Sequence, residues 1–252
     1  MKEKHIELNN IGFSYSRGNL IFDYVSLKLN KGESIAIIGG NGAGKTTLLM
    51  LLTGILFPQT GEISISNQPI KKENLQNILQ QTGVIFQNPD DQLFMPTVFE
   101  ELAFAPRNFK FKEAKVHAMV FRALARVEGL HLQDKLIYQL SGGEKRQVAI
   151  ATALVMNPSI LIMDEPSSGL DLAGRRRLID LIKNFKQTKI IATHDLDMAL
   201  EVCNRVIIIG KGKVIADGKS YDILTNEKLL KQNNLELPIS VQNCHICGFE
   251  KK

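Results

Sequence analysis

The chain has 252 residues, 44% of them hydrophobic and 23% charged, which is the balance of a folded globular protein and excludes general disorder. Its net charge of +5 fits an anionic ligand or membrane face, although scattered surface lysines explain so small an excess equally well. No run reaches the ~18 apolar residues of a membrane-spanning helix, the first residues lack the apolar core of a signal peptide, and three cysteines make no disulfide framework, so we expect a cytoplasmic protein.

The first seventy residues predict the opening of an α/β domain. Short apolar runs at Ile6–Leu8, Leu27–Leu29 and Ile63–Ile65 are bounded by turn residues and predict strands. Ser34–Ile38 is almost continuously apolar, as expected of a strand buried on both faces. A glycine-rich turn and a predicted helix, Lys45–Leu56, follow it, and this order is typical of a doubly wound α/β domain.

The glycine-rich turn matches the phosphate-loop pattern G-x-x-x-x-G-K-[ST] without a gap. Glycines allow successive backbone N–H groups to turn towards an anion, and the following helix adds its partial positive charge. Lys45 is expected to reach the β and γ phosphates of ATP, and the Thr46 hydroxyl to bind Mg²⁺. A glycine turn that binds nothing is the less favoured alternative. We predict ATP contacts from Gly39, Gly40, Asn41, Gly42, Ala43, Gly44, Lys45, Thr46 and Thr47.

The middle of the chain changes to helical periodicity. Lys112–Glu128 has apolar residues close to a 3.6-residue repeat, whereas strands are predicted again at Ser159–Met163, Lys189–Thr193 and Arg205–Ile209. We therefore expect one domain over residues 1–230, with a helical subdomain inserted at about 89–158. Residues 231–252 are expected to form a polar tail.

Two acids, Asp164 and Glu165, end the apolar strand of residues 160–163. Such a strand delivers its terminal carboxylates to the sheet edge where α/β proteins bind ligands. Asp164 is expected to hold Mg²⁺, and Glu165 to polarise the water that attacks the γ-phosphate. Taken alone, the pair would also suit the start of a helix.

Residues 140–144, Leu-Ser-Gly-Gly-Glu, resemble the signature motif of the ABC ATPase family. The resemblance covers roughly residues 4 to 225 and implies an α/β fold: a RecA-like parallel-sheet core, an N-terminal antiparallel β subdomain and a helical subdomain. Tyr15 resembles the aromatic residue that stacks on adenine, although next to Phe13 it would also suit a strand core. Gln87 resembles the Q-loop glutamine, and His194 the switch histidine. Ser168-Gly169-Leu170-Asp171 resembles the D-loop, and we assign ATP contacts also to Ser141, Gly142, Gly143 and Asp171.

The resemblance further implies a mechanism that needs two subunits. Two ATP molecules lie head to tail between a pair of ABC ATPase subunits, which are identical or paralogous. Glu165 and His194 act in hydrolysis, and Mg²⁺ is bound by Thr46, Gln87 and Asp164. Glu144 departs from the glutamine often found after the signature glycines, and Gly169 from the commoner D-loop alanine, but neither removes a catalytic group.

Residues 86–104 resemble the energy-coupling-factor branch, which includes cobalt, nickel and vitamin importers. This implies a peripheral subunit on the cytoplasmic face of the cell membrane, partnered by a transmembrane coupling protein and a substrate-capture membrane protein. We expect Asp90, Asp91, Glu100 and Glu101 to form an acidic groove for the coupling protein, or else a solvated loop.

Two other functions are weighed against the transport ATPase. A non-transport ABC ATPase usually carries long coiled-coil insertions or two ATPase domains, and the mild charge gives no reason to expect a nucleic-acid partner. An ATP-gated interaction module without turnover is disfavoured by Glu165 and His194. In the tail, Cys244 and Cys247 form a lone C-x-x-C, which is either a plain surface feature or half of a metal site shared by two chains.

Overall fold

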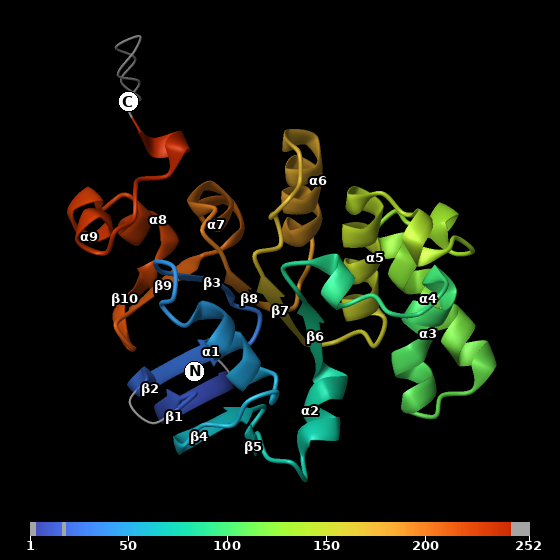
Figure 1. The fold of residues 1–252 in the computed structure, drawn as a ribbon, viewed down its shortest axis with the longest axis horizontal. Helices are drawn as coiled ribbons and strands as arrows, with labels where there is room; N and C mark the ends of the chain where they lie inside the picture. The colour runs from blue at the N-terminus through green and yellow to red at the C-terminus, as the bar shows by residue number, and fades with distance from the viewer. Residues whose placement is uncertain (1–3, 17–18, 243–252) are drawn as a thin grey trace. The chain divides into compact units, whose positions relative to one another are not determined.

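The computed structural model describes residues 4–16 and 19–242 (Figure 1). The chain divides into two compact units. The first unit contains the described residues up to Asn74 and those from Thr188 onwards. The second unit runs from Leu75 to Gln187.

The first unit begins with an antiparallel sheet in the strand order β2-β1-β4-β5. Its core face is apolar, with Ile6, Leu8, Phe22 and Ile63 buried. The register of β1 shifts between Leu8 and Ile11, so the strand runs on past an irregularity. The bounds of these strands are β1 Lys4–Ser14, β2 Leu20–Asn30, β4 Thr60–Ile65 and β5 Gln68–Pro69.

The same unit holds the strands that carry the phosphate loop. The order is β10-β9-β3-β8, in which β3 pairs in parallel with β8 and β9, and β10 is antiparallel to β9. Every residue of β3 and β8 is buried; in β3 this agrees with the nearly continuous apolar run of the sequence, whereas β8 also buries Thr188 and Lys189. The strands are β3 Ser34–Ile38, β8 Thr188–Ala192, β9 Arg205–Gly210 and β10 Lys213–Lys219.

Short helices complete the first unit. Helix α1 ends four residues earlier than predicted, because Thr53 caps it and Gly54 turns away with a φ of 71°. At the other end of the unit, the carboxylate of Asp197 accepts hydrogen bonds from the backbone N–H groups of Ile239 (3.0 Å) and Ser240 (2.8 Å). The helices are α1 Lys45–Leu52, α7 Leu196–Val202, α8 Ser220–Leu224, α9 Glu227–Gln232 and the 3-10 turn η4 Ile239–Val241.

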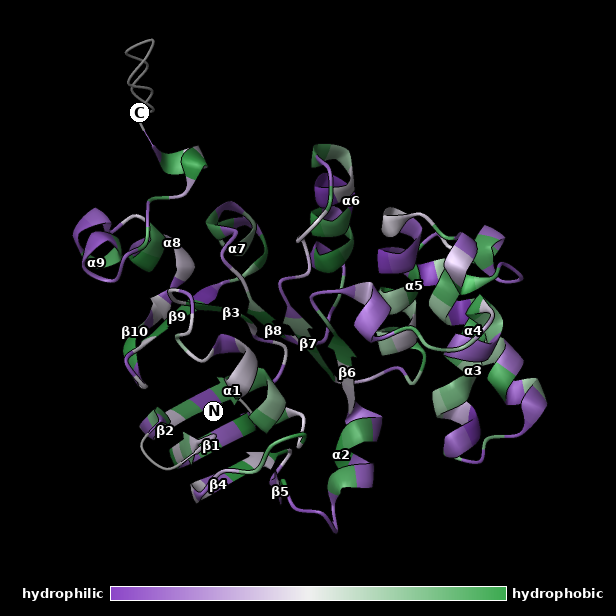
Figure 2. Cartoon of the chain, in the orientation of Figure 1, coloured by the Kyte–Doolittle hydropathy of each residue, from purple (hydrophilic) through white to green (hydrophobic). Residues whose placement is uncertain are grey.

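The second unit contains one parallel strand pair and most of the helices. Strand β6 (Thr82–Ile85) pairs with β7 (Ile160–Asp164), and Ile85 lies opposite Met163. Figure 2 shows α3, α4 and α6 with alternating hydrophobic and hydrophilic residues, as expected of helices with one buried face. The helices are α2 Leu75–Gln81, α3 Val98–Asn108, α4 Glu113–Arg126, α5 Gly142–Leu154 and α6 Leu172–Lys183, with 3-10 turns η1 Pro89–Asp91, η2 Leu130–Leu132 and η3 Ile137–Gln139.

The helical character predicted for residues 89–158 agrees with the elements found there, since these fully described residues form η1, α3, α4, η2, η3 and α5. That they fold as a separate subdomain stays a prediction. Helix α9 continues past residue 230, and the predicted Cys244/Cys247 motif lies outside the described residues. Within the described residues, no helix has the length and apolar character needed to cross a membrane.

Candidate functional site

The phosphate loop lies between β3 and α1, and the local geometry favours glycine at three of its four glycine positions, Gly39, Gly42 and Gly44. Gly44 caps α1 with a φ of 98°, and Gly42 has a φ of 73°, both in the left-handed region that favours glycine. A Cβ on Gly39 would lie 2.3 Å from the backbone oxygen of Ile209. The loop therefore adopts a backbone that other residues would strain.

Lys45 begins α1 and reaches back across this loop. Its Nζ donates to the carbonyl oxygens of Gly39 (2.9 Å) and Gly40 (3.4 Å), and Ala43 N–H donates to Gly40 O (3.2 Å). The ammonium group thus lies over the turn whose N–H groups the sequence assigned to phosphates. A cation beside a helix N-terminus favours an anionic ligand.

Tyr15 lies beside this helix and is 56% exposed, so it is not the strand core residue that was the alternative. Its hydroxyl hydrogen-bonds with Thr47 Oγ1 at 3.1 Å, and its ring meets that of Phe13 edge to face, with 5.1 Å between centroids. The ring is held at two points while remaining accessible, as a stacking platform for a flat base must be.

His194 emerges at the same sheet edge as the phosphate loop. Strands β3 and β8 are parallel neighbours with Ile37 opposite Ala192, and Thr193 N–H donates to Ile37 O at 3.2 Å. His194 follows directly and is exposed. Parallel strands end at one edge, so the first unit brings the phosphate loop and the predicted switch histidine to the same edge.

The second unit has a corresponding strand edge. Gln87 lies two residues beyond β6, and Asp164 is the last residue of the adjacent parallel strand β7. Gln87 is exposed and Asp164 half-buried. An amide oxygen and a carboxylate oxygen are ligands that Mg²⁺ accepts, so the donor set of this edge fits that ion.

Glu165 follows Asp164 in a strained turn. It is buried and has a φ of 42°, unusual for a residue with a side chain, and its carbonyl oxygen accepts a hydrogen bond from Ser168 N–H (3.0 Å). Gly169 has a φ of 74°, in the left-handed region that favours glycine. Asp171 ends the turn and caps α6 by accepting from Gly174 N–H at 2.7 Å.

The predicted signature residues form the start of α5. Ser141 caps the helix, and Glu144 bonds back to Ser141 N–H (2.8 Å) and Oγ (2.9 Å) in a capping box. Lys135 donates to the other carboxylate oxygen of Glu144 at 2.7 Å. This ion pair, followed by the bonds from Ser141, lowers the pKa of Glu144 to about 2. A Cβ added to Gly142 or Gly143 would meet nothing within 4 Å, so neither glycine is required by packing within this chain.

The structure corrects the predicted acidic groove. Glu101 is only 6% exposed, and its carboxylate accepts the backbone N–H groups of Phe94 and Met95, each at 2.8 Å. Asp90 is paired with Lys145 at 2.6 Å. Asp90, Asp91 and Glu100 remain exposed, and an aromatic pair is exposed beside them in the sequence: Phe94 (64% exposed) and Phe104 (38%) meet edge to face at 5.0 Å. The sequence predicted a surface role for Glu101 because it does not reveal that this carboxylate accepts hydrogen bonds from backbone N–H groups.

Sequence reasoning also missed Arg146, which lies on α5 and is 4% exposed. It donates to the carbonyl oxygens of Phe86, of the predicted site residue Gln87 and of Ser168 in the turn after Glu165. The signal available in the sequence was a pair of adjacent basic residues, Lys145 and Arg146, just before the apolar run of residues 148–150.

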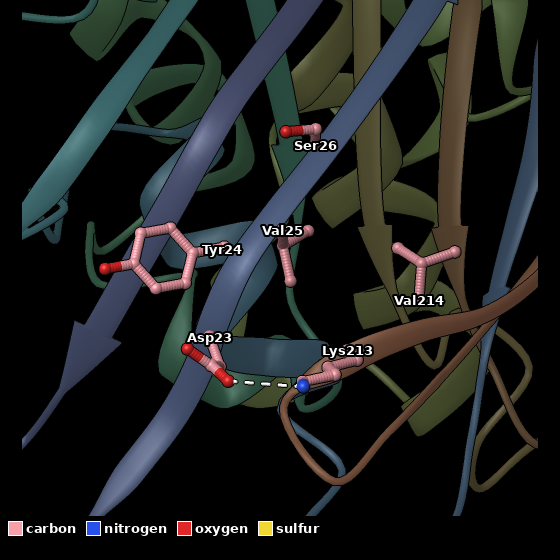
Figure 3. A pocket seen from close by; sticks show the side chains of 6 residues that line it. All are labelled: Asp23, Tyr24, Val25, Ser26, Lys213 and Val214. Carbon is pink, nitrogen blue, oxygen red and sulfur yellow. Dashed lines mark ion pairs between the residues drawn. The ribbon is translucent and has the colours of Figure 1, made fainter.

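A surface pocket of about 400 Å³ lies between β2 and β10 and is lined by none of the residues described above (Figure 3). The side chains of Asp23 and Lys213 point towards each other at its rim, with Oδ2 and Nζ 3.4 Å apart. The sequence assigned no role to any of its lining residues, which are Asp23, Tyr24, Val25, Ser26, Lys213 and Val214.

Comparison with known proteins identifies the family of this chain. Residues 22–168 match the family model described as ABC transporter. A putative ABC transporter ATP-binding protein of Geobacter sulfurreducens is 45% identical over 248 residues, which cover 98% of this chain and 100% of the relative. The energy-coupling factor transporter ATP-binding protein EcfA of Carboxydothermus hydrogenoformans is 38% identical, over 94% of this chain and 88% of the relative. The solved structure of cbiO1 from Clostridium perfringens, described as part of the ABC transporter complex cbiONQ, has a TM-score of 0.82 and 35% identity, and covers 94% of this chain and 97% of that chain.

The phosphate loop together with the structural match to cbiO1 shows the fold of an ABC-type ATPase, which confirms the fold-class prediction. The chain belongs to the ABC transporter ATP-binding family. It is therefore a nucleotide-binding ATP hydrolase and the ATPase subunit of a transporter.

Proposed function

We propose that this chain is the motor subunit of an energy-coupling-factor importer, working from the cytoplasmic face of the membrane. The carrying observation is the exposed pair Phe94 and Phe104, which lies within the segment 86–104 whose sequence resembles that branch. The likeness to EcfA and to cbiO1 supports the same branch. A metal ion such as cobalt or nickel, or a vitamin, is the proposed cargo.

Each residue at the two strand edges has a proposed role. Lys45 and the loop N–H groups bind the phosphates of ATP, and Tyr15 stacks on its base. Glu165 accepts a proton from the attacking water, and its burial keeps competing solvent away. His194 donates a hydrogen bond to the γ-phosphate. Mg²⁺, held by Asp164, Gln87 and Thr46, neutralises phosphate charge when bound.

A second ABC ATPase subunit is the proposed partner at the start of α5. Gly142 and Gly143 face open space, so the absence of side chains there serves something outside the chain. A γ-phosphate bound by a partner subunit fits that role, because Ser141 and the first amides of a helix bind anions. Identical and paralogous partners are equally compatible with this surface.

The membrane partner is proposed to bind the aromatic pair, with the exposed acids Asp91 and Glu100 nearby in sequence. Exposed apolar groups of this kind mark interaction sites more often than charged loops do. We therefore propose an apolar contact through Phe94 and Phe104, with acidic residues near them in the sequence, in place of the predicted acidic groove. A separate membrane protein is proposed to capture the substrate.

The catalytic proposal is tested with Glu165→Gln in the assembled transporter. Phosphate release is expected to fall by roughly 100-fold or more while ATP still binds, because the general base is lost and the phosphate loop is not. Glu73→Gln, which alters an exposed acid, serves as the control. Wild-type phosphate release by Glu165→Gln would refute the assigned role.

The partner proposal is tested by co-purification with the membrane proteins encoded by the same cell. Phe94→Ser together with Phe104→Ser is expected to abolish recovery of a transmembrane coupling protein. Phe121→Ser removes an equally exposed aromatic from α4 and is expected to leave recovery unchanged. Equal recovery with both variants would exclude the aromatic pair as the contact.

A further inference from the structure

Arg146 makes three hydrogen bonds to backbone carbonyl groups from two separate parts of the second unit. Its Nη1 donates to Phe86 O at 2.7 Å, and its Nη2 donates to Gln87 O. Nη2 also lies 3.3 Å from Ser168 O. One side chain on α5 therefore connects the end of β6 to the turn that follows β7.

Both connected segments carry groups proposed to act on ATP. Phe86 and Gln87 form the backbone from which the Gln87 side chain extends. Ser168 closes the turn of Glu165, because its N–H donates to Glu165 O at 3.0 Å. The backbone of Glu165 has a positive φ of 42°, a conformation that persists only when its surroundings hold it.

The charge of Arg146 is not explained by folding alone. It is 4% exposed, its Nε has no hydrogen-bond partner, and in the described chain no acidic side chain opposes the burial that lowers its pKa. A buried cation without a counter-charge is costly, and an apolar residue of similar length would fill the same space at lower cost. Its guanidinium is, however, a rigid fork that can fix several acceptors at once.

We propose that Arg146 is a positioning residue for ATP hydrolysis, which fixes the Gln87 backbone and the Glu165 turn at a set distance from each other. The inference rests on the proposed roles of Gln87 and Glu165. Arg146 touches neither the nucleotide nor the attacking water in this role. It acts through the two backbone segments that it joins.

The test compares Arg146→Met and Arg146→Lys in steady-state ATP hydrolysis by the assembled transporter. Arg146→Met keeps an unbranched apolar stem but none of the donors, so kcat is expected to fall by roughly 10- to 100-fold, as small misplacements of catalytic groups do. The KM for ATP is expected to stay within about threefold, because the phosphate loop is untouched. Arg146→Lys keeps the positive charge and N–H donors but loses the planar guanidinium that can bond several acceptors at once. Its kcat should therefore lie between that of the wild type and that of Arg146→Met.

Val148→Ala is the matched control for a merely structural effect, since it truncates a buried side chain on the same helix. It is expected to lower the thermal midpoint while keeping kcat. A kcat loss in Val148→Ala as large as that in Arg146→Met would overturn the proposal. A wild-type kcat in Arg146→Lys would also overturn the proposal. This second comparison remains available if Arg146→Met does not fold.

Glu165→Gln, assayed in parallel, separates failure of this inference from failure of the proposed function. If Glu165→Gln loses hydrolysis and Arg146→Met keeps it, only the positioning role is wrong. If both variants keep the wild-type kcat, the assigned hydrolytic machinery is itself wrong, and the inference fails with it.

Discussion

Two glycine turns of this protein precede helices, yet they use glycine for different reasons. In the phosphate loop, Gly39 is packed against Ile209 O, and Gly44 has a left-handed backbone. At the start of α5, Gly142 and Gly143 have open space around them and ordinary backbone angles. Packing and backbone geometry within the chain explain Gly39 and Gly44, whereas Gly142 and Gly143 have no such explanation, which is why we propose that a partner binds there.

The largest expected effect concerns the phosphate loop. Lys45→Ala removes the cation that lies over the loop, and one such charge pair at 4 Å is worth about 4 kcal/mol at an effective dielectric near 20. ATP affinity measured by calorimetry should therefore fall by about 100-fold or more. Lys211→Ala, which changes an exposed lysine, should bind ATP normally. Equal affinity in Lys45→Ala would remove the loop from the nucleotide site.

The contrast between the two turns is tested directly by adding a methyl group to each. Gly39→Ala should lose about 1–3 kcal/mol of unfolding free energy, because its Cβ overlaps a backbone oxygen. Gly143→Ala should instead gain about 0.5–1 kcal/mol, since alanine favours a helix more than glycine does. Chemical denaturation of both variants measures the change in unfolding free energy, which should be a loss for Gly39→Ala and a gain for Gly143→Ala.

Gly143→Ala should nevertheless hydrolyse ATP more slowly in the assembled transporter, where the extra methyl group would meet the partner's nucleotide. A variant that is both more stable and fully active would show that the open space at α5 is not a binding surface. The phosphate loop and the start of α5 would then differ only in local backbone strain.

A smaller effect is expected from the base-stacking residue. Tyr15→Ala removes the exposed ring beside α1, and ring contacts of this kind are worth about 0.5–1.5 kcal/mol. ATP affinity should fall by roughly tenfold or less, whereas Tyr15→Phe keeps the ring and should retain most of it. The stacking role is wrong if Tyr15→Ala and Tyr15→Phe bind ATP alike.

The smallest effect concerns the carboxylate at the second turn. The pKa of Glu144 is lowered to about 2 from 4.5, so its ionised form stabilises the fold fully above pH 4.5 and progressively less as the pH falls towards 2. Because the pair with Lys135 is partly exposed, the change should be below about 1 kcal/mol. Urea unfolding between pH 6 and pH 3 should show this extra loss in the wild type and not in Glu144→Gln. If the free energy of unfolding falls by the same amount in the wild type and in Glu144→Gln, the stabilising role of the Glu144 carboxylate is wrong.

Much of the fold could be predicted where the pattern is continuous. The predicted strand Ser34–Ile38 has the bounds of β3, and the predicted helix Lys112–Glu128 contains α4. Strand β1 was predicted as only Ile6–Leu8, because register shifts and the positive φ of Asn10 interrupt its alternation. Strand β10 was missed because it alternates only between exposed and half-buried residues.

The motifs of the candidate site could be recognised in the sequence, whereas the contacts that hold them in place could not. Glycine spacing and strand-end acids predict roles for Lys45 and Asp164 because those patterns are local in the sequence. The roles of Arg146 and Glu101 depend on which backbone groups lie within reach after folding. No spacing rule encodes those contacts between distant segments.

The hydrogen bonds from Ile239 and Ser240 to Asp197 also bear on how the protein is made. During synthesis, helix α7 leaves the ribosome before Ile239 and Ser240, whose N–H groups bond to its Asp197. At about 5–20 residues per second, the interval between Asp197 and Ser240 lasts roughly 2–9 seconds. During that interval the first turn of α7 lacks these two contacts, so this part of the first unit is completed late in translation.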